Sequence, residues 1–296
     1  MCMSVEEKGR AEWFTEASLL LAVLFLGTNP VAVKIAVSEV PPLLFVAARF
    51  TLAGLLLLVL VLLLRLERPG RRDALSMAAV GLVGVGMNNI AFTLGVSMTT
   101  ASDTALIYAV VPIWGILLGL ALGLERPTRW GIVGVALAFL GVGVVVYGGL
   151  GGGGGTTLKG DLLVVVATVC WGSYAVLSLP LLSRHPPLVV AAYTMLFGGF
   201  AAVPFALPDL VSAGLVEPSR GAWEAVAYST LLVAAFGFYA WQRGVSQVGA
   251  NRVLVYQYLI TLVGVGSGVV MLGEGLTANK ILGGTIILGG VYLARR

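Results

Sequence analysis

The residues that could do chemistry in this sequence are polar side chains inside long apolar runs. Asn29 precedes Pro30 in "GTNPVAVK", Asn88 and Asn89 are adjacent, and Arg49 stands alone in an otherwise uncharged stretch. A polar or charged group inside hydrocarbon is costly unless it faces a cavity or a partner. Each of them is therefore a candidate for binding a polar solute.

Arg49 and the paired asparagines leave alternatives open. Arg49 could attract a carboxylate, snorkel to the outer interface, or pair with another group inside the protein. Successive helical side chains point about 100° apart. We therefore expect at most one of Asn88 and Asn89 to face a cavity, with the other bonding a neighbouring helix.

Aromatic side chains form a second group of candidates. In "CWGSYAV", Trp171 and Tyr174 could stack on an organic solute, although a lipid-facing position explains Trp171 nearly as well. In "FGFYAWQR", Tyr239 is a candidate, but an aromatic belt at the inner interface explains Tyr239 and Trp241 more simply. Tyr108 and Gln257 lie deeper in their apolar runs.

Bond-breaking chemistry has no signature in the sequence. We find no G-x-S-x-G nucleophile motif, no paired acids at midspan and no cluster of metal ligands. The acids Asp103, Glu125 and Glu274 fall at the ends of apolar runs, which disfavours tight proton coupling. We expect no enzyme activity, no cofactor and no metal site.

Composition places the elements that carry these residues in a bilayer. Of 296 residues, 58% are hydrophobic and 11% are charged, which exceeds the apolar content of a soluble core. A helix of roughly 20 apolar residues crosses a hydrocarbon core about 30 Å thick. We predict an all-α polytopic membrane protein with ten transmembrane helices at residues 17–37, 43–64, 74–95, 102–122, 130–148, 161–180, 187–206, 222–241, 250–271 and 279–294.

Lys and Arg are distributed unevenly between the two sides of this arrangement. With the amino terminus inside, most basic residues fall on the cytoplasmic side, including the stretch "RLERPGRR" at 65–72. The outer side then holds Lys159, Arg220 and Lys280, with Lys34 near it. Because basic loops stay cytoplasmic, both termini are predicted to be cytoplasmic, and the net charge of +4 reflects topology rather than nucleic-acid binding.

The chain repeats itself. An ungapped shift of 149 residues pairs 91–142 with 240–291, and a shift of 145 pairs the segments before them. Among the matched pairs are Glu125/Glu274, Thr128/Thr277, Gly134/Gly283 and Gly141/Gly290. We predict a cytoplasmic tail (1–16), a first five-helix repeat (17–148), a Gly-rich external linker (149–160) and a second five-helix repeat (161–294).

Five helices per repeat is an odd number, so the second repeat enters the membrane with the opposite sense. Inverted repeats are typical of secondary transporters, which bind solutes near the midplane and rock about that site. Tyr108 and Gln257 are repeat mates and are predicted to flank one central site. Pro30 and Pro112 are candidate hinges, and Thr261 replaces the mate of Pro112, so the second hinge is assigned to Gly264.

The ten-helix duplicated plan, with "VVPIWGILLGL", "LGLERPT" and "MLGEGLTANKILGGTIILGGVYLARR", resembles the EamA branch of the drug/metabolite transporter superfamily. The resemblance implies a multi-pass carrier in a bacterial inner membrane that moves small metabolites, often amino acids, mostly outward. It implies membrane lipid and a small-molecule substrate as partners, with no nucleic acid, in a monomer or homodimer.

Other functions fit the sequence less well. A carrier of nucleobases, vitamins or drug-like solutes is the alternative, and the missing deep carboxylate argues against cationic ones. A channel would show charge rings or a filter loop. A non-transport membrane subunit would not require an inverted duplication.

Overall fold

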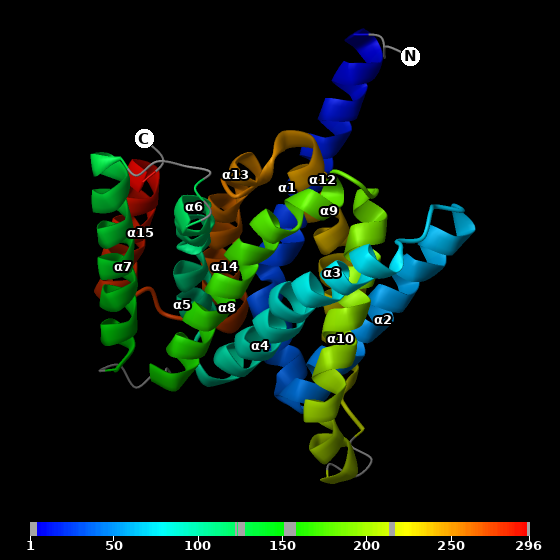
Figure 1. Ribbon diagram of the computed structural model, residues 1–296. Helices are drawn as coiled ribbons and strands as arrows, with labels where there is room; N and C mark the ends of the chain where they lie inside the picture. Colours follow the sequence, from blue (N-terminus) through cyan, green and yellow to red (C-terminus); the bar gives the residue numbers. More distant parts are fainter. Residues whose placement is uncertain (1–4, 122, 124–127, 151–157, 213–216, 295–296) are drawn as a thin grey trace.

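The computed structural model describes residues 5–121, 123, 128–150, 158–212 and 217–294, and every regular element among them is a helix (Figure 1). Eight helical stretches are long and apolar enough to cross a membrane. Two shorter apolar helices, Tyr256–Leu272 and Ala278–Ala294, accompany them. The prediction of an all-α polytopic membrane protein is confirmed, whereas ten crossings stay a prediction.

The helices of the first part of the chain are α1 (Val5–Val37), α2 (Pro42–Leu63), α3 (Arg71–Gly81), the π-helical η1 (Leu82–Met87), α4 (Asn88–Met98), α5 (Ala101–Tyr108), α6 (Val111–Ala121) and α7 (Arg129–Leu150). Those of the second part are α8 (Leu158–Leu177), α9 (Leu179–Leu182), α10 (Pro187–Ser212), α11 (Arg220–Tyr228), the π-helical η2 (Ser229–Gly237), α12 (Phe238–Val248), α13 (Ala250–Val253), α14 (Tyr256–Leu272) and α15 (Ala278–Ala294).

The predicted segments outside the spans are partly helical. α1 begins at Val5, inside the predicted tail 1–16, of which residues 1–4 lie outside the described part of the chain. α7 and α8 both extend into the predicted linker 149–160, whose residues 151–157 also lie outside it. Glu125 also lies outside the described part of the chain, so its equivalence with Glu274 stays a prediction.

Five of the predicted spans are interrupted. The span 161–180 breaks at Ser178, between α8 and α9. The spans 74–95 and 222–241 each pass through a π-helical segment, η1 and η2. The span 102–122 breaks at Ala109–Val110, directly before α6, whose second residue is Pro112. The span 250–271 breaks at Leu254–Val255. α14 runs through Gly264 without interruption, and the hinge assigned to that residue stays a prediction.

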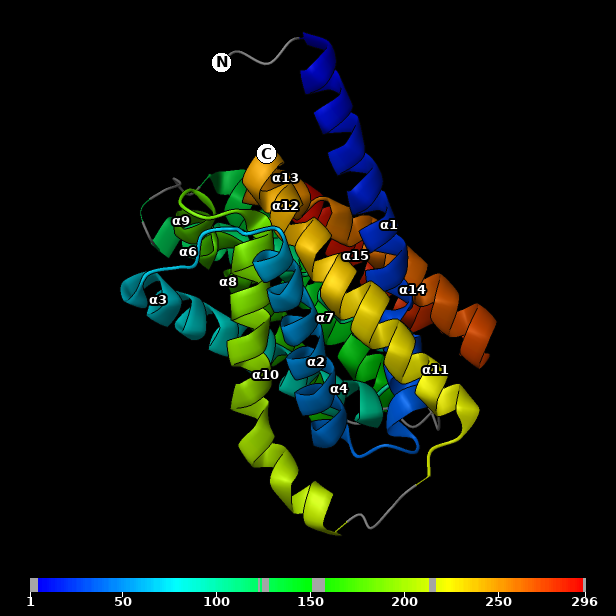
Figure 2. The ribbon, with the colours of Figure 1, turned by 90° about the vertical axis from the view of Figure 1, so that its right-hand side faces the viewer.

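Segments distant in sequence pair along their lengths. α2 packs along α10, and α7 along α15, as the two perpendicular views show (Figures 1 and 2). Between these outer pairs, α1 lies against α14 and η2, and α4 lies against α8. The first and second parts of the chain are therefore interleaved in one helical body.

The α7–α15 pair is held close by four glycines. A Cβ atom built on Gly134 would lie 2.5 Å from the carbonyl oxygen of Gly290, and one built on Gly290 would lie 2.7 Å from that of Gly134. Gly141 and Gly283 approach in the same way, at 2.8 and 2.9 Å. Real side chains do not tolerate such distances, so this seam requires glycine, as close helix contacts in membranes do.

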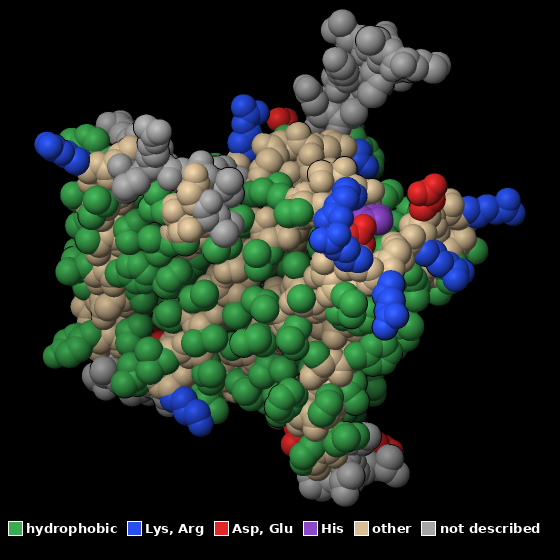
Figure 3. Space-filling view, viewed as in Figure 1, with side chains coloured by type: hydrophobic (Ala, Val, Ile, Leu, Met, Phe, Trp, Pro, Cys, Tyr) green, Lys and Arg blue, Asp and Glu red, His purple; other side chains and the backbone are tan. Residues whose placement is uncertain are grey.

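Apolar side chains dominate the surface between the two ends of the molecule. Figure 3 shows a broad apolar belt, with most Lys and Arg side chains gathered toward one end. Large exposed residues such as Leu63, Tyr147 and Val270 contribute to this surface. A contiguous apolar belt of this extent marks contact with lipid.

Candidate functional site

A cavity lies in the middle of the helical body, where helices from both parts of the chain converge. About 540 Å³ among its lining side chains is not filled by atoms, a volume that includes the open solvent at its mouth. Its lining consists of Leu26, Gly27, Asn29 and Pro30 from α1, Arg49 from α2, Asn88, Asn89 and Phe92 from α4, Thr104, Ala105 and Tyr108 from α5, Trp171 from α8, Phe238 from α12, and Gln257 and Ile260 from α14.

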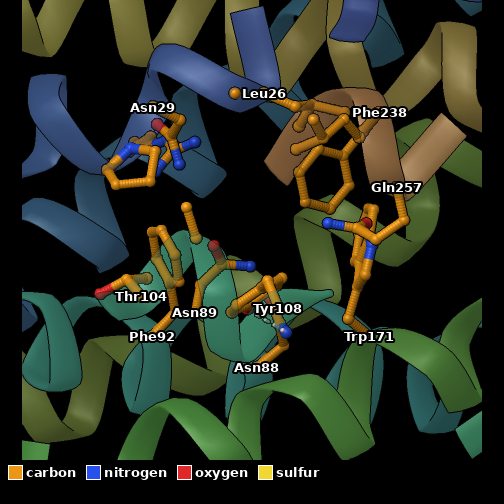
Figure 4. Close-up of a pocket in the computed structure, with 15 residues that line it drawn as sticks. Leu26, Asn29, Asn88, Asn89, Phe92, Thr104, Tyr108, Trp171, Phe238 and Gln257 are labelled. Atoms are coloured by element: carbon orange, nitrogen blue, oxygen red, sulfur yellow. Dashed lines mark hydrogen bonds between the residues drawn. The ribbon is translucent and has the colours of Figure 1, made fainter. Parts of the chain in front are cut away.

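The two asparagines of α4 both border the cavity, next to Tyr108 (Figure 4). Asn88 Nδ2 donates to the Tyr108 hydroxyl at 3.1 Å and to the Ala167 carbonyl of α8 at 2.7 Å. Asn89 Nδ2 donates to the Val85 carbonyl at 2.9 Å, one turn back in η1. The expectation that only one asparagine faces a cavity was therefore wrong, because the cavity wraps around more than one side of α4.

The wall of α1 presents a polar break in an apolar helix. Asn29 Oδ1 accepts a hydrogen bond from Ser229 Oγ, the first residue of η2, at 2.9 Å. Pro30 has no amide hydrogen, so the carbonyl of Leu26 lacks its usual helical donor. α1 nevertheless continues to Val37. Asn29 thus ties α1 to η2 beside the cavity.

Gln257, in the first turn of α14, lines the cavity from the second part of the chain (Figure 4). Its side chain is 1% exposed, and neither Nε2 nor Oε1 has a hydrogen-bond partner within the described residues. A buried amide with no partner costs about 1–3 kcal/mol. The group is therefore poised to bind something that enters the cavity.

Aromatic rings cover two sides of the cavity. Phe92 and Tyr108 meet edge to face with centroids 5.4 Å apart, and Trp171 and Phe238 do so at 4.9 Å. These rings give an apolar body two faces on which to pack.

Two predicted aromatic contacts lie outside this lining. Tyr174 is fully buried, stacks on Trp171 and bonds through its hydroxyl to Thr194 Oγ1 at 2.9 Å. The Tyr239 hydroxyl accepts from Arg243 instead. Trp241 is 1% exposed, so its assignment to an interfacial belt was wrong. Phe238, one residue and about 100° from Tyr239, is the side chain that reaches the cavity.

Arg49 is fully internal. It is 1% exposed, and its Nε donates to the Ser229 carbonyl at 3.0 Å. The snorkelling alternative is therefore wrong, because α2 packs against α10 and η2 and the Arg49 side chain is buried instead of reaching the surface.

Most cavity residues that the sequence did not predict are helical neighbours of residues it did. Phe92 follows Asn88 by four positions, Thr104 precedes Tyr108 by four, and Ile260 follows Gln257 by three. Such positions share a helix face, so periodicity could have found them.

Pro112 and Gly264 lie outside the lining. A Cβ on Gly264 would stand 2.6 Å from that of Ala105, which makes this glycine a packing residue between α14 and α5.

A network of partly buried charges adjoins one end of the cavity. Glu274 Oε1 accepts from the Ala101 amide at 2.8 Å, and Oε2 accepts from the Ser102 amide at 2.8 Å and from its hydroxyl at 2.6 Å. Lys34 Nζ stands 3.5 Å from Glu274 and donates to the Thr99 carbonyl at 2.7 Å. We call these residues the Glu274 lock. Because Thr104 and Ala105 follow within one turn, the lock ties down the wall at this end of the cavity.

Three further interactions extend the Glu274 lock. Lys280 Nζ lies 3.4 Å from Asp103 and donates to the Thr100 hydroxyl at 3.0 Å. Thr99 Oγ1 donates to Asp161 at 2.6 Å. The ends of α1, α5, α8 and α15 are thereby joined around one polar cluster.

The charge state of Glu274 follows from these contacts. Burial raises its pKa, but the hydrogen bonds from Ser102 and Ala101 and the charge of Lys34 outweigh burial and hold the pKa below its usual range. The carboxylate is therefore ionised at neutral pH, where a helix amino terminus stabilises it further.

These features define a multi-pass helical membrane protein with a polar and aromatic cavity at its centre. The model of the EamA-like transporter family matches residues 13–147 and 158–296. The chain therefore belongs to the EamA-like transporter family, and the resemblance predicted from the sequence is confirmed.

Individual relatives are distant but align along most of their length. A protein of Archaeoglobus fulgidus named "Uncharacterized transporter" is 26% identical over 94% of this chain and 97% of its own. The "Probable terminal-alkyne amino-acid exporter" of Streptantibioticus cattleyicolor is 29% identical over 84% and 82%. A solved structure called "Crystal structure of protein" superimposes with a TM-score of 0.63 over 95% and 96%, at 22% identity, and shares the fold.

Proposed function

We propose that this protein is a secondary transporter that exports amino acids or related small organic metabolites by alternating access at the central cavity. The observation that carries the proposal is the placement of Asn88 and Gln257, from the two family-matched segments, on walls of one cavity. The name of the Streptantibioticus cattleyicolor relative supports amino acids as the substrate class.

An inverted repeat would supply the two exchangeable halves. The glycine seam, formed by Gly134 and Gly141 of α7 with Gly283 and Gly290 of α15, supports an inverted repeat. Gly134 contacts Gly290. The sequence mates of these two residues are Gly283 and Gly141, and they form the other contact of the seam. A contact set that maps onto itself on exchange is expected of two halves related by a pseudo-twofold axis. We infer ten crossing helices in repeats 17–148 and 161–294.

The proposed location is a bacterial inner membrane with both termini cytoplasmic. The gathering of Lys and Arg toward one end of the apolar belt supports this orientation (Figure 3). The Glu274 lock then lies at the outer side. A reporter fused after Arg296 is expected to be active only in the cytoplasm, and activity in the periplasm would contradict the orientation.

Counterflow in proteoliposomes tests the function. Purified protein is reconstituted into vesicles that are loaded with an unlabelled solute. Uptake of the same solute in labelled form is then followed for a panel of amino acids, nucleobases and cationic drugs. We expect uptake of one or more amino acids in protein-containing vesicles but not in empty ones. Uptake of nucleobases or drugs alone would replace amino acids as the substrate class, and no uptake of any solute would contradict transport.

A further inference from the structure

Arg49 carries hydrogen-bond donors that the fold leaves unused. Its Nε is engaged by the Ser229 carbonyl, but Nη1 and Nη2 are buried without a hydrogen-bond partner in the described part of the chain. The guanidinium carbon lies 4.7 Å from the Phe50 ring centroid and 5.6 Å from that of Phe45. Ring faces attract a cation through their π electrons, but they do not replace the directed hydrogen bonds that Nη1 and Nη2 can donate.

Among the described residues, no counter-ion compensates the charge of Arg49. Arg49 is the one residue with a full charge among the 15 that line the cavity, and no ion pair in the described residues includes it. An uncompensated charge out of water costs several kcal/mol. The arrangement is therefore incomplete until an anionic group enters the cavity.

The geometry of the free donors selects the kind of anion. The two terminal nitrogens of a guanidinium form a planar fork that matches the two oxygens of a carboxylate. We propose that Arg49 binds the carboxylate of the solute in the central cavity. This inference rests on the proposed function and narrows its substrate class to organic carboxylates, either zwitterions or monoanions.

The other side chains of the cavity can bind the parts of such a solute that lie beyond its carboxylate. Gln257 offers both a free donor and a free acceptor for a polar substituent such as an amino or hydroxyl group. Phe92, Trp171 and Phe238 offer apolar faces for the body of the solute (Figure 4). Since the described residues that line the cavity include Arg49 and no acid, a solute with a net positive charge is repelled there.

Matched acids and amides test the proposal on the unmodified protein. Protein in lipid nanodiscs is titrated with 3-phenylpropionate and 3-phenylpropionamide, and with L-phenylalanine and L-phenylalaninamide, while tryptophan fluorescence reports binding near Trp171. We expect at least one acid to bind about tenfold or more tightly than its amide. Binding of no acid, or amides that bind as tightly as the acids, would overturn the proposal.

A variant pair assigns the preference to Arg49. Arg49→Lys keeps the charge but removes the fork, and we expect its preference for acid over amide to fall by about tenfold. Arg220→Lys is the matched control, because the Arg220 side chain is 93% exposed on α11. An unchanged preference in Arg49→Lys would overturn the assignment, and the wild-type acid–amide comparison stands even if that variant does not fold.

The outcomes separate this inference from the transport proposal. Acid-selective binding without counterflow of any solute would contradict transport and leave the carboxylate site standing. Counterflow of only neutral or cationic solutes, with acids excluded, would support transport and overturn the carboxylate site.

Discussion

Glu274 caps the first turn of α5 by accepting hydrogen bonds from both the amide and the hydroxyl of Ser102, a residue 172 positions away in the chain. The α14–α15 connection is thereby fastened to the helix that carries Thr104 and Tyr108 into the cavity. If the halves rock during transport, this contact between the two family-matched segments must break and re-form.

Removing the carboxylate should loosen the start of α5. In Glu274→Ala we expect faster hydrogen–deuterium exchange at the amides of Ala101 and Ser102, and a loss of stability of about 1–2 kcal/mol for charge-assisted hydrogen bonds at a partly exposed site. Glu224→Ala is the control, since Glu224 is an exposed acid that pairs with Arg220 in the same helix. Equal exchange in the two variants would contradict the lock.

The Glu274 lock should resist mild acid. A carboxylate whose pKa is lowered by folding contributes its stability above the unfolded pKa and loses it as the pH falls through the folded value. The usual value is 4.5 and that of Glu274 lies below it. The difference in melting temperature between wild type and Glu274→Gln should therefore stay constant from neutral pH down to about 5.5 and shrink only below about 4.5. A difference in melting temperature that disappears between pH 7 and about pH 5.5 would show that folding raises the pKa of Glu274 instead.

Alanine substitutions in α7 should change the stability of the protein according to whether the glycine lies in the glycine seam. A methyl group on Gly134 would lie 2.2 Å from the backbone nitrogen of Ala294, whereas one on Gly143 of the same helix would meet nothing within 4 Å. We expect Gly134→Ala to lower the melting temperature, with a cost of about 1–3 kcal/mol for overpacking. Gly143→Ala should be neutral or gain up to about 1 kcal/mol. Equal melting temperatures for the two variants would contradict the close α7–α15 contact.

The sequence was sufficient to find the polar cavity residues except Thr104, but not to tell neighbouring apolar ones apart. Asn29, Asn88, Tyr108 and Gln257 stand out because a polar group in an apolar helix needs a cavity or a partner. Phe238 does not stand out, because Phe238 and Trp241 are both apolar and only the rotation of α12 decides which one reaches the cavity.

The π-helical segments η1 and η2 escaped prediction for a related reason. A π-helical turn adds one residue without requiring glycine, proline or any other marker. It shifts the face that each following residue presents. η1 ends directly before Asn88, so the side on which Asn88 and Asn89 emerge depends on a feature that hydrophobic periodicity does not record.

The central claim, that the solute passes through the cavity between the two parts of the chain, is tested most directly by counterflow of a labelled amino acid in Tyr108→Ala and Gln257→Ala. Asn279→Ala, an exposed change at the start of α15, is the matched control. We predict that both cavity variants, checked for intact folding, lose most of the counterflow, by about tenfold or more for a lost solute contact, while the control keeps it. Wild-type counterflow in both cavity variants would contradict the account.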